Sequence, residues 1–259
     1  MPTVRGTQPT LHKISRYGWI PDLPDKRDVP YATLMKAAPL PASVDLTAKC
    51  PPVYDQGQLG SCTANAIGAA LEFDQKISPF VPSRLFIYYN ERAIEGTVPS
   101  DNGAQIRDGI KSVSSQGACD EVLWPYNVSE FAVTPTPPCY AAALKFTATN
   151  YYSIDQDLTQ MKTCLAEGFP FVFGFTVYDA FESAAVAANG VLDLPGPDEH
   201  VIGGHAVLAV GYDEASQRVR VRNSWGAGWG QAGYFTMPYA YITDPNLATD
   251  FWTIRLTSE

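Results

Sequence analysis

The chain changes its hydrophobic pattern near residue 146, and this change limits the folds that are open to it. Upstream, three segments are typical of helices, at residues 62–76, 83–95 and 104–116. Downstream, five short segments separated by Gly, Pro and Asp turns are typical of strands, at residues 171–177, 205–212, 218–222, 233–237 and 251–256. A helical half followed by a β half predicts an α+β protein with two lobes.

The ends of the three helical segments carry cap residues. Ser61 and Ser83 each come directly before a segment, where a side-chain oxygen can accept from a free backbone N–H group. Gly117 follows the third segment, and glycine commonly ends a helix. We therefore expect Ser61 and Ser83 to cap the first and second helices.

Composition and charge exclude several classes of protein. The chain has 259 residues, of which 46 % are hydrophobic and 17 % charged, so it can bury a core and is not largely disordered. The 21 prolines and 20 glycines argue against a helical bundle. A net charge of −9 without a Lys/Arg cluster disfavours a nucleic-acid partner. Apolar runs such as Phe169 to Val177 are too short to span a membrane.

The start of the chain predicts neither a signal peptide nor a core of its own. No apolar run follows Met1, so the compartment stays open between the cytoplasm and export by a non-classical route. Residues 1–41 hold seven prolines and no sustained helical pattern, so they either extend over a folded body or are disordered. The aromatic side chains of Tyr17, Trp19 and Tyr31 favour docking.

Five cysteines and three histidines narrow the chemistry. Their spacing contains no paired Cys/His motif, so we expect no metal site. An odd number of cysteines leaves at least one thiol unpaired, and such a thiol with a distant histidine is a candidate nucleophile. His12 and His200 have no feature of a catalytic residue. The disulfide pairing of four cysteines stays open: Cys50, Cys119, Cys139 and Cys164.

One cysteine stands at the start of a predicted helix. In Tyr54 to Ala66, two glycines and a serine lead into Cys62. The free N–H groups of a helix N-terminus favour a thiolate and can stabilise an oxyanion, to which the Gln56 amide could also donate. The alternative is that Cys62 is a small residue packed in an Ala-rich helix, since free cysteines are usually buried.

Two further segments could complete a catalytic group. His205 follows two glycines and opens a predicted strand, where its ring could take the thiol proton and return it to a leaving amine. Asn223 ends the next strand and could orient that ring, under the cover of Trp225 and Trp229. Each segment could equally be structural: a histidine bonded to local backbone, and tryptophans that pack a glycine-rich turn.

Taken together, these segments resemble the papain-like cysteine peptidases. The family's Q-x(5)-C opening corresponds to Gln56–Cys62, its histidine strand to His205–Tyr212 and its asparagine turn to Asn223–Gly230. The resemblance covers residues 42–259, and the extension and residues 168–178 are similar to the bacterial, xylellain-like branch. It implies a two-lobed fold, with a helical lobe over residues 42–145, an antiparallel β-barrel-like lobe over 146–259 and the active-site cleft between them.

The resemblance also implies a reaction, which is hydrolysis of peptide or protein substrates through a thioester. It implies that Cys62 is the nucleophile, His205 the general base and acid, and Asn223 the orienting group, with Gln56 and the Cys62 N–H as oxyanion donors. It implies no cofactor. Residues implied to contact substrate are Gly103, Gly203, Gly204 and Trp225. Alternatives on the same fold are acyl transfer to an amine and a non-catalytic binding module.

The chain departs from the family in four places. Leu59 replaces a disulfide cysteine, Thr63 replaces the tryptophan after the nucleophile, and Leu46 replaces the tryptophan of the mature start. The extension, residues 1–41, is much shorter than the family's helical propeptide. Our hypothesis is that it lies across the cleft in cis as a short regulatory strap; an arm held elsewhere on the surface is the alternative. We expect a monomer.

Overall fold

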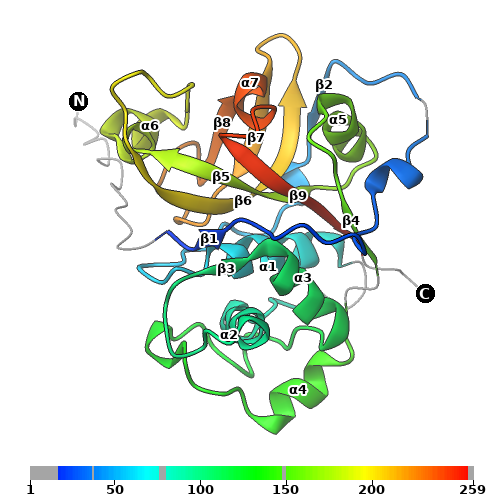
Figure 1. Ribbon diagram of the computed structural model, residues 1–259, viewed down its shortest axis with the longest axis vertical. Helices are drawn as coiled ribbons and strands as arrows, with labels where there is room; N and C mark the ends of the chain where they lie inside the picture. Colours follow the sequence, from blue (N-terminus) through cyan, green and yellow to red (C-terminus); the bar gives the residue numbers. More distant parts are fainter. Residues whose placement is uncertain (1–16, 37, 76–79, 148–149, 256–259) are drawn as a thin grey trace, which may run out of the picture.

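The helices of the first half of the chain and the sheet occupy separate regions of the molecule (Figure 1), as the two-lobed prediction requires. The computed structural model describes residues 17–36, 38–75, 80–147 and 150–255. In Figure 1 the sheet fills the upper part and α2 (Arg84–Glu95), α3 (Ile106–Ser115) and α4 (Pro137–Ala143) the lower part, with α1 (Cys62–Asp74) between them. The α+β class is confirmed.

Helix α1 is the central element of the fold. It spans Cys62–Asp74 and packs against strand β6 of the sheet on one side and against α2 and α3 on the other. Nearly all of its side chains are buried, because alanines and Gly68 let the neighbouring elements approach its whole circumference. The other helices of this region are α2 (Arg84–Glu95), α3 (Ile106–Ser115) and α4 (Pro137–Ala143).

Both predicted residues hold the N-cap positions, but only Ser83 makes the expected side-chain bond. The Ser83 hydroxyl accepts from the Phe86 N–H at 3.1 Å, and Gly96 ends the same helix in a left-handed conformation. Ser61 holds the N-cap position of α1, but its side chain makes no cap bond. Its hydroxyl pairs instead with the Tyr126 hydroxyl at 2.5 Å, because the tyrosine ring reaches this buried helix end. The third helix starts at Ile106, since Ala104–Gln105 form strand β3.

The sheet has seven strands, and it is open. Its order is β4-β9-β5-β6-β7-β8 with β2 added beside β6, and the pairings are antiparallel. The strands are β2 (Ser43–Asp45), β4 (Asn150–Ser153), β5 (Phe171–Tyr178), β6 (Val201–Asp213), β7 (Arg218–Arg222), β8 (Tyr234–Pro238) and β9 (Ala248–Arg255). Within the described part of the chain, β4 and β8 do not pair with each other, so the sheet is not closed into a barrel.

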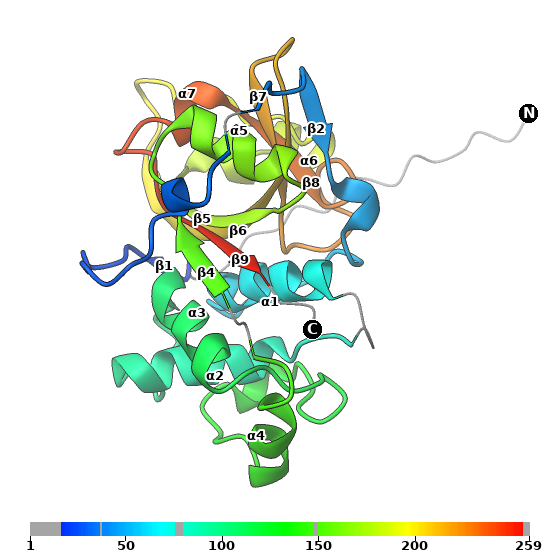
Figure 2. The ribbon, with the colours of Figure 1, turned by 90° about the vertical axis from the view of Figure 1, so that its right-hand side faces the viewer.

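Short helices that the sequence did not predict complete the sheet region. They are α5 (Leu158–Ala166), α6 (Ala184–Asn189) and α7 (Tyr239–Ile242), and α5 and α7 lie above strands β5 and β9 in Figure 2. Strand β2 joins the sheet although it comes early in the chain. The lobe boundaries at residues 42 and 146 therefore stay a prediction.

The first described part of the N-terminal extension, residues 17–36, is here called the arm. Its strand β1 (Trp19–Ile20) pairs in parallel with β3, and it crosses the junction of sheet and helices in Figure 1. Tyr31 is fully buried, and Trp19 is 9 % exposed. The expected docking of these aromatic side chains is confirmed, because both rings belong to the core of the protein.

A buried carboxyl group behind α1 makes stability depend on pH. Glu91 is fully buried and accepts from the Thr63 hydroxyl at 2.6 Å, and its burial, with Glu95 and Asp108 nearby, raises its pKa well above the ordinary value. The folded chain then holds a proton that the unfolded chain releases above about pH 4.3, so the free energy of unfolding falls as pH rises.

Replacing Glu91 with glutamine should therefore stabilise the protein at pH 8 and change little at pH 4. The amide keeps an acceptor for Thr63 and removes the titration. Each kcal/mol regained at pH 8 raises Tm by about 2 to 4 °C. Thermal unfolding at both pH values tests this, with the exposed Asp155→Asn as the control. An equal gain at both pH values would contradict the explanation.

Candidate active site

Cys62 lies at the N-terminus of α1, where helices and sheet meet. Its side chain is fully buried, and the loop before it is held by Asp101, which accepts from the Gly60 N–H at 3.0 Å. Backbone N–H groups of three residues bond to its sulfur: Ala206 of β6, Gly18 of the arm and Thr63 of α1. The thiol thus contacts the sheet, the helix and the arm at once.

Burial dominates the electrostatics of this thiol. It raises the pKa of Cys62 from an ordinary 9.0 to about 12, although the three N–H groups act in the opposite direction. A helix N-terminus by itself favours the thiolate. In this structure desolvation outweighs it, so the thiol is neutral at pH 7.

His205 and Asn223 form a buried pair. The strands β6 and β7 are neighbours, and the His205 Nε2 and Asn223 Oδ1 atoms are 2.8 Å apart. An amide oxygen can only accept, so Nε2 carries the proton and Nδ1 is the basic nitrogen of the neutral ring. The Trp225 ring lies over the imidazole, with 5.3 Å between ring centroids, and both rings are buried.

Gln56 is fixed beside the turn that follows Asn223. Its Oε1 accepts from the Ser224 hydroxyl at 2.6 Å, and its Nε2 donates to the Leu59 carbonyl at 3.0 Å. The side-chain amide is fully buried, and its second N–H direction is set by these two bonds. Ser224 is a positioning residue that the sequence reasoning did not single out, although it stands inside the Asn223–Gly230 segment.

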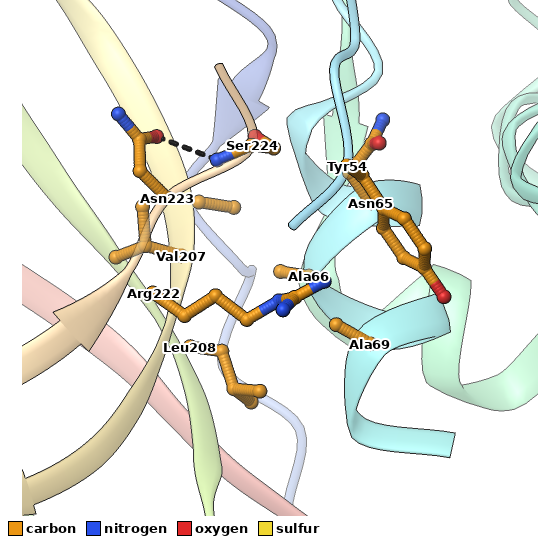
Figure 3. Close-up of a pocket in the computed structure, with 10 residues that line it drawn as sticks. Tyr54, Asn65, Ala66, Ala69, Val207, Leu208, Arg222, Asn223 and Ser224 are labelled. Carbon is orange, nitrogen blue, oxygen red and sulfur yellow. Dashed lines mark hydrogen bonds between the residues drawn. The ribbon is translucent and has the colours of Figure 1, made fainter. Parts of the chain in front are cut away.

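Behind these residues, a buried arginine ties the sheet to the segment before α1. In Figure 3, Arg222 extends from β7 toward Ala66 and Ala69 of α1. Its guanidinium donates to the carbonyls of Pro51 and Pro52 at 2.5 and 2.6 Å. The same view shows Asn223 Oδ1 accepting from the Ser224 N–H at 2.8 Å, which fixes the amide oxygen toward the imidazole.

The four residues predicted to contact substrate surround the arm. The Gly18 carbonyl accepts from the Ala104 N–H, directly after Gly103, and a Cβ at Gly103 would lie 2.0 Å from the Gly18 oxygen. A Cβ at Gly203 would meet Tyr17, and one at Gly204 would meet Trp19. The Trp225 ring centroid is 6.4 Å from that of Tyr17.

Tyr17 and Trp19 are each fixed by an acidic residue that the sequence reasoning missed. The Tyr17 hydroxyl donates to Glu182 at 2.7 Å, and its ring packs edge-on against His205 at 5.9 Å. The Trp19 Nε1 donates to Asp250 at 2.9 Å. Long-range contacts of this kind leave no local signal in the sequence.

The remaining cysteines and histidines lie away from this group. All five cysteines carry free thiols. His200 is largely exposed, and His12 lies outside the described residues. Among the described residues, no three His, Cys, Asp or Glu side chains are arranged to hold a metal ion, and no helix is long and apolar enough to cross a membrane.

Comparisons with known proteins agree with this geometry. The family described as papain family cysteine protease matches residues 40–250. An uncharacterized peptidase C1-like protein of Acanthamoeba polyphaga mimivirus is 42 % identical, over 93 % of this chain and 88 % of that protein. Xylellain, a cysteine protease from Xylella fastidiosa, is 44 % identical with a TM-score of 0.86, over 93 % of this chain and 96 % of the other. The digestive procathepsin L 3 of Tenebrio molitor shares the fold at 21 % identity and a TM-score of 0.70, over 88 % and 74 %.

Proposed function

Because the chain belongs to the papain family of cysteine proteases, we propose that it hydrolyses peptide bonds through a thioester formed on Cys62. The observation that carries the proposal is the contact between Cys62 and the backbone of Ala206 in β6. Ala206 directly follows His205, whose Nε2 lies 2.8 Å from Asn223 Oδ1, so the contact brings the thiol to the His205–Asn223 pair. The chain is similar to both a bacterial and a viral protein, so its bacterial origin stays a prediction. The monomeric state also stays a prediction.

The proposed reaction has two halves. In the first, Cys62 Sγ attacks the peptide carbonyl while His205 Nδ1 takes the thiol proton and then returns it to the leaving amine. Asn223 holds the imidazolium through Nε2, and the Cys62 N–H and Gln56 amide donate to the oxyanion. In the second half, His205 Nδ1 takes a proton from water as the water oxygen attacks the thioester carbonyl. The bond between the carbonyl carbon and Cys62 Sγ then breaks, the acid is released, and the sulfur regains the proton from His205.

We also propose that the arm regulates this site in cis. Two contacts support this: the Gly18 N–H bonds to the Cys62 sulfur, and the Tyr17 ring packs on His205. A substrate cannot reach the sulfur while these residues are in place. Only residues 17–21 need to move, because the second half of the arm is anchored by buried Tyr31 and by the Ser153 N–H, which donates to the Val29 carbonyl at 3.0 Å.

The Asn223 amide should matter for catalysis through His205. In Asn223→Ala the imidazole loses the acceptor at Nε2, so we expect kcat to fall by about tenfold to a hundredfold with little change in KM. Steady-state kinetics on one peptide measure this, with Asn189→Ala, in an exposed helix end, as the control. An unchanged kcat would contradict the assigned role.

Peptide cleavage with product analysis tests the proposed function. The full chain is incubated with a peptide library, with and without an added amine, and products are identified by mass spectrometry. Free carboxyl products in both reactions support hydrolysis. Amide products that dominate with the amine present would indicate acyl transfer, and binding without any product would indicate a non-catalytic module.

A further inference from the structure

The Trp19 side chain fills a socket between two strands. The socket walls are Gly174 of β5 and Gly204 of β6, and a Cβ at either would lie 1.9 or 2.6 Å from the indole. Trp19 is 9 % exposed. The space exists because neither strand has a side chain there, and a large group from outside the sheet fills it.

A carboxylate stands at the inner end of this socket. Asp250 Oδ2 accepts from the Trp19 Nε1 at 2.9 Å and from the Asp22 N–H at 2.8 Å. Beside it lies a cavity of about 200 Å³, lined mainly by polar groups that include Asp250, Asp22 and Arg107. A side chain that entered the socket would therefore meet apolar walls first and a carboxylate at the end.

The charges that face this carboxylate are mostly negative. Asp22 accepts from the Trp252 Nε1 at 2.8 Å and from the Arg107 backbone N–H at 3.1 Å. The Arg107 guanidinium is engaged by the Asp28 carboxylate at 2.7 Å and by the Leu23 carbonyl. Arg107, a cation that lines the cavity, is thus matched by Asp28, which leaves Asp22 and Asp250 facing each other.

The surroundings of Asp22 and Asp250 affect the protonation of both carboxyl groups. Burial and the neighbouring carboxylate raise the pKa of Asp22 to about 7, and burial raises the pKa of Asp250. A cation placed between the two groups would restore their ionised forms, so the site is suited to a positive ligand. Asp22, Leu23 and Asp28 belong to the anchored half of the arm and stay when residues 17–21 move.

We infer that the Trp19 socket receives a basic side chain of the substrate and that Asp250 selects it. The inference rests on the proposed peptidase function. The aliphatic stem of an arginine or lysine packs between Gly174 and Gly204, and its charged end bonds to Asp250 in place of the indole N–H. The arm then covers the sulfur and fills the specificity socket with the same short segment.

The first experiment compares arginine with citrulline, its neutral isostere. The full chain with Gly18→Ala and Trp19→Ala is given peptides that differ only in this residue, placed in turn at each position around the scissile bond. At one position arginine should raise kcat/KM by about 10- to 100-fold. Adding Asp250→Asn should bring the ratio of kcat/KM for arginine and citrulline close to one. Asparagine tolerates the left-handed φ of 59° at this position. Adding Asp198→Asn, on an exposed loop, should leave it unchanged.

The second experiment needs no turnover. In the full chain, Trp19→Arg should keep the arm seated, so a thiol-directed epoxide should label Cys62 at least about tenfold more slowly than in Trp19→Gln. Asp250→Asn should remove this difference.

The outcomes separate the two claims. Cleavage with equal rates for arginine and citrulline at every position overturns this inference alone, as does an arginine preference that survives Asp250→Asn. Equal labelling of Trp19→Arg and Trp19→Gln overturns it without reference to activity. If no peptide is cleaved, the proposed function fails and the substrate preference fails with it.

Discussion

Replacing Cys62 with alanine should lower peptide hydrolysis by about 10⁴-fold or more, and labelling by a thiol-directed epoxide at this position should stop. The sulfur is the only atom of the proposed site that forms a covalent bond to the substrate. Alanine is smaller than cysteine and similarly apolar, so helix α1 should keep its packing between the sheet and the other helices.

The matched control is Cys50→Ala, which removes a half-buried thiol outside the site. It should retain the full rate of hydrolysis and the labelling of Cys62. Both rates are measured on purified protein whose Tm is checked first. Turnover that persists in Cys62→Ala would refute the catalytic assignment, whatever the labelling shows.

Replacing Gly18 with alanine should have the opposite effect and activate the enzyme. A Cβ at this position would lie 1.7 Å from the Gly60 carbonyl oxygen, which is backbone and cannot rotate away. The segment around Gly18 must therefore leave the site, and the sulfur becomes accessible. We expect hydrolysis and Cys62 labelling to rise by about tenfold or more, since a few kcal/mol of docking free energy are lost.

The pH profile of labelling gives a second readout for the same variant. Burial raises the pKa of Cys62 to about 12 in the covered state, so its thiolate is scarce at pH 7. Solvent access in Gly18→Ala reverses that shift, and the profile should move to lower pH. The control Gly196→Ala places a methyl 3.7 Å from the nearest side-chain atom and should behave like the unaltered chain. Equal rates in all three proteins would mean that the arm does not limit access.

The main elements around the site could be predicted because their signals are local. Strand β7 occupies the predicted residues 218–222, and α1 begins at Cys62 as expected. Ser61 holds the predicted N-cap position without the expected side-chain bond, because a tertiary partner, Tyr126, takes its hydroxyl. A cap motif cannot show which distant ring will reach it. The open sheet could not be predicted for the same reason, since closure into a barrel depends on whether the distant strands β4 and β8 meet.

The electrostatics could be predicted less well than the residue types. The helix N-terminus at Cys62 suggested a lowered pKa, and this reasoning omitted the solvent that the arm excludes. Similarly, Asp250 and Glu182 stand far along the chain from the arm residues that they bind, Trp19 and Tyr17. Only the fold brings them together, because neither side of these pairs carries a motif.

The anchorage of the arm at Tyr31 has a consequence for how the enzyme responds to concentration. Tyr31 is fully buried, so residues 17–21 remain tethered to the body even when they leave the sulfur. Their return is an intramolecular event, with an effective concentration in the millimolar range for a short linker. Dilution should not activate such an enzyme. A separate peptide with the arm sequence would have to reach millimolar levels before it competed with the tethered copy.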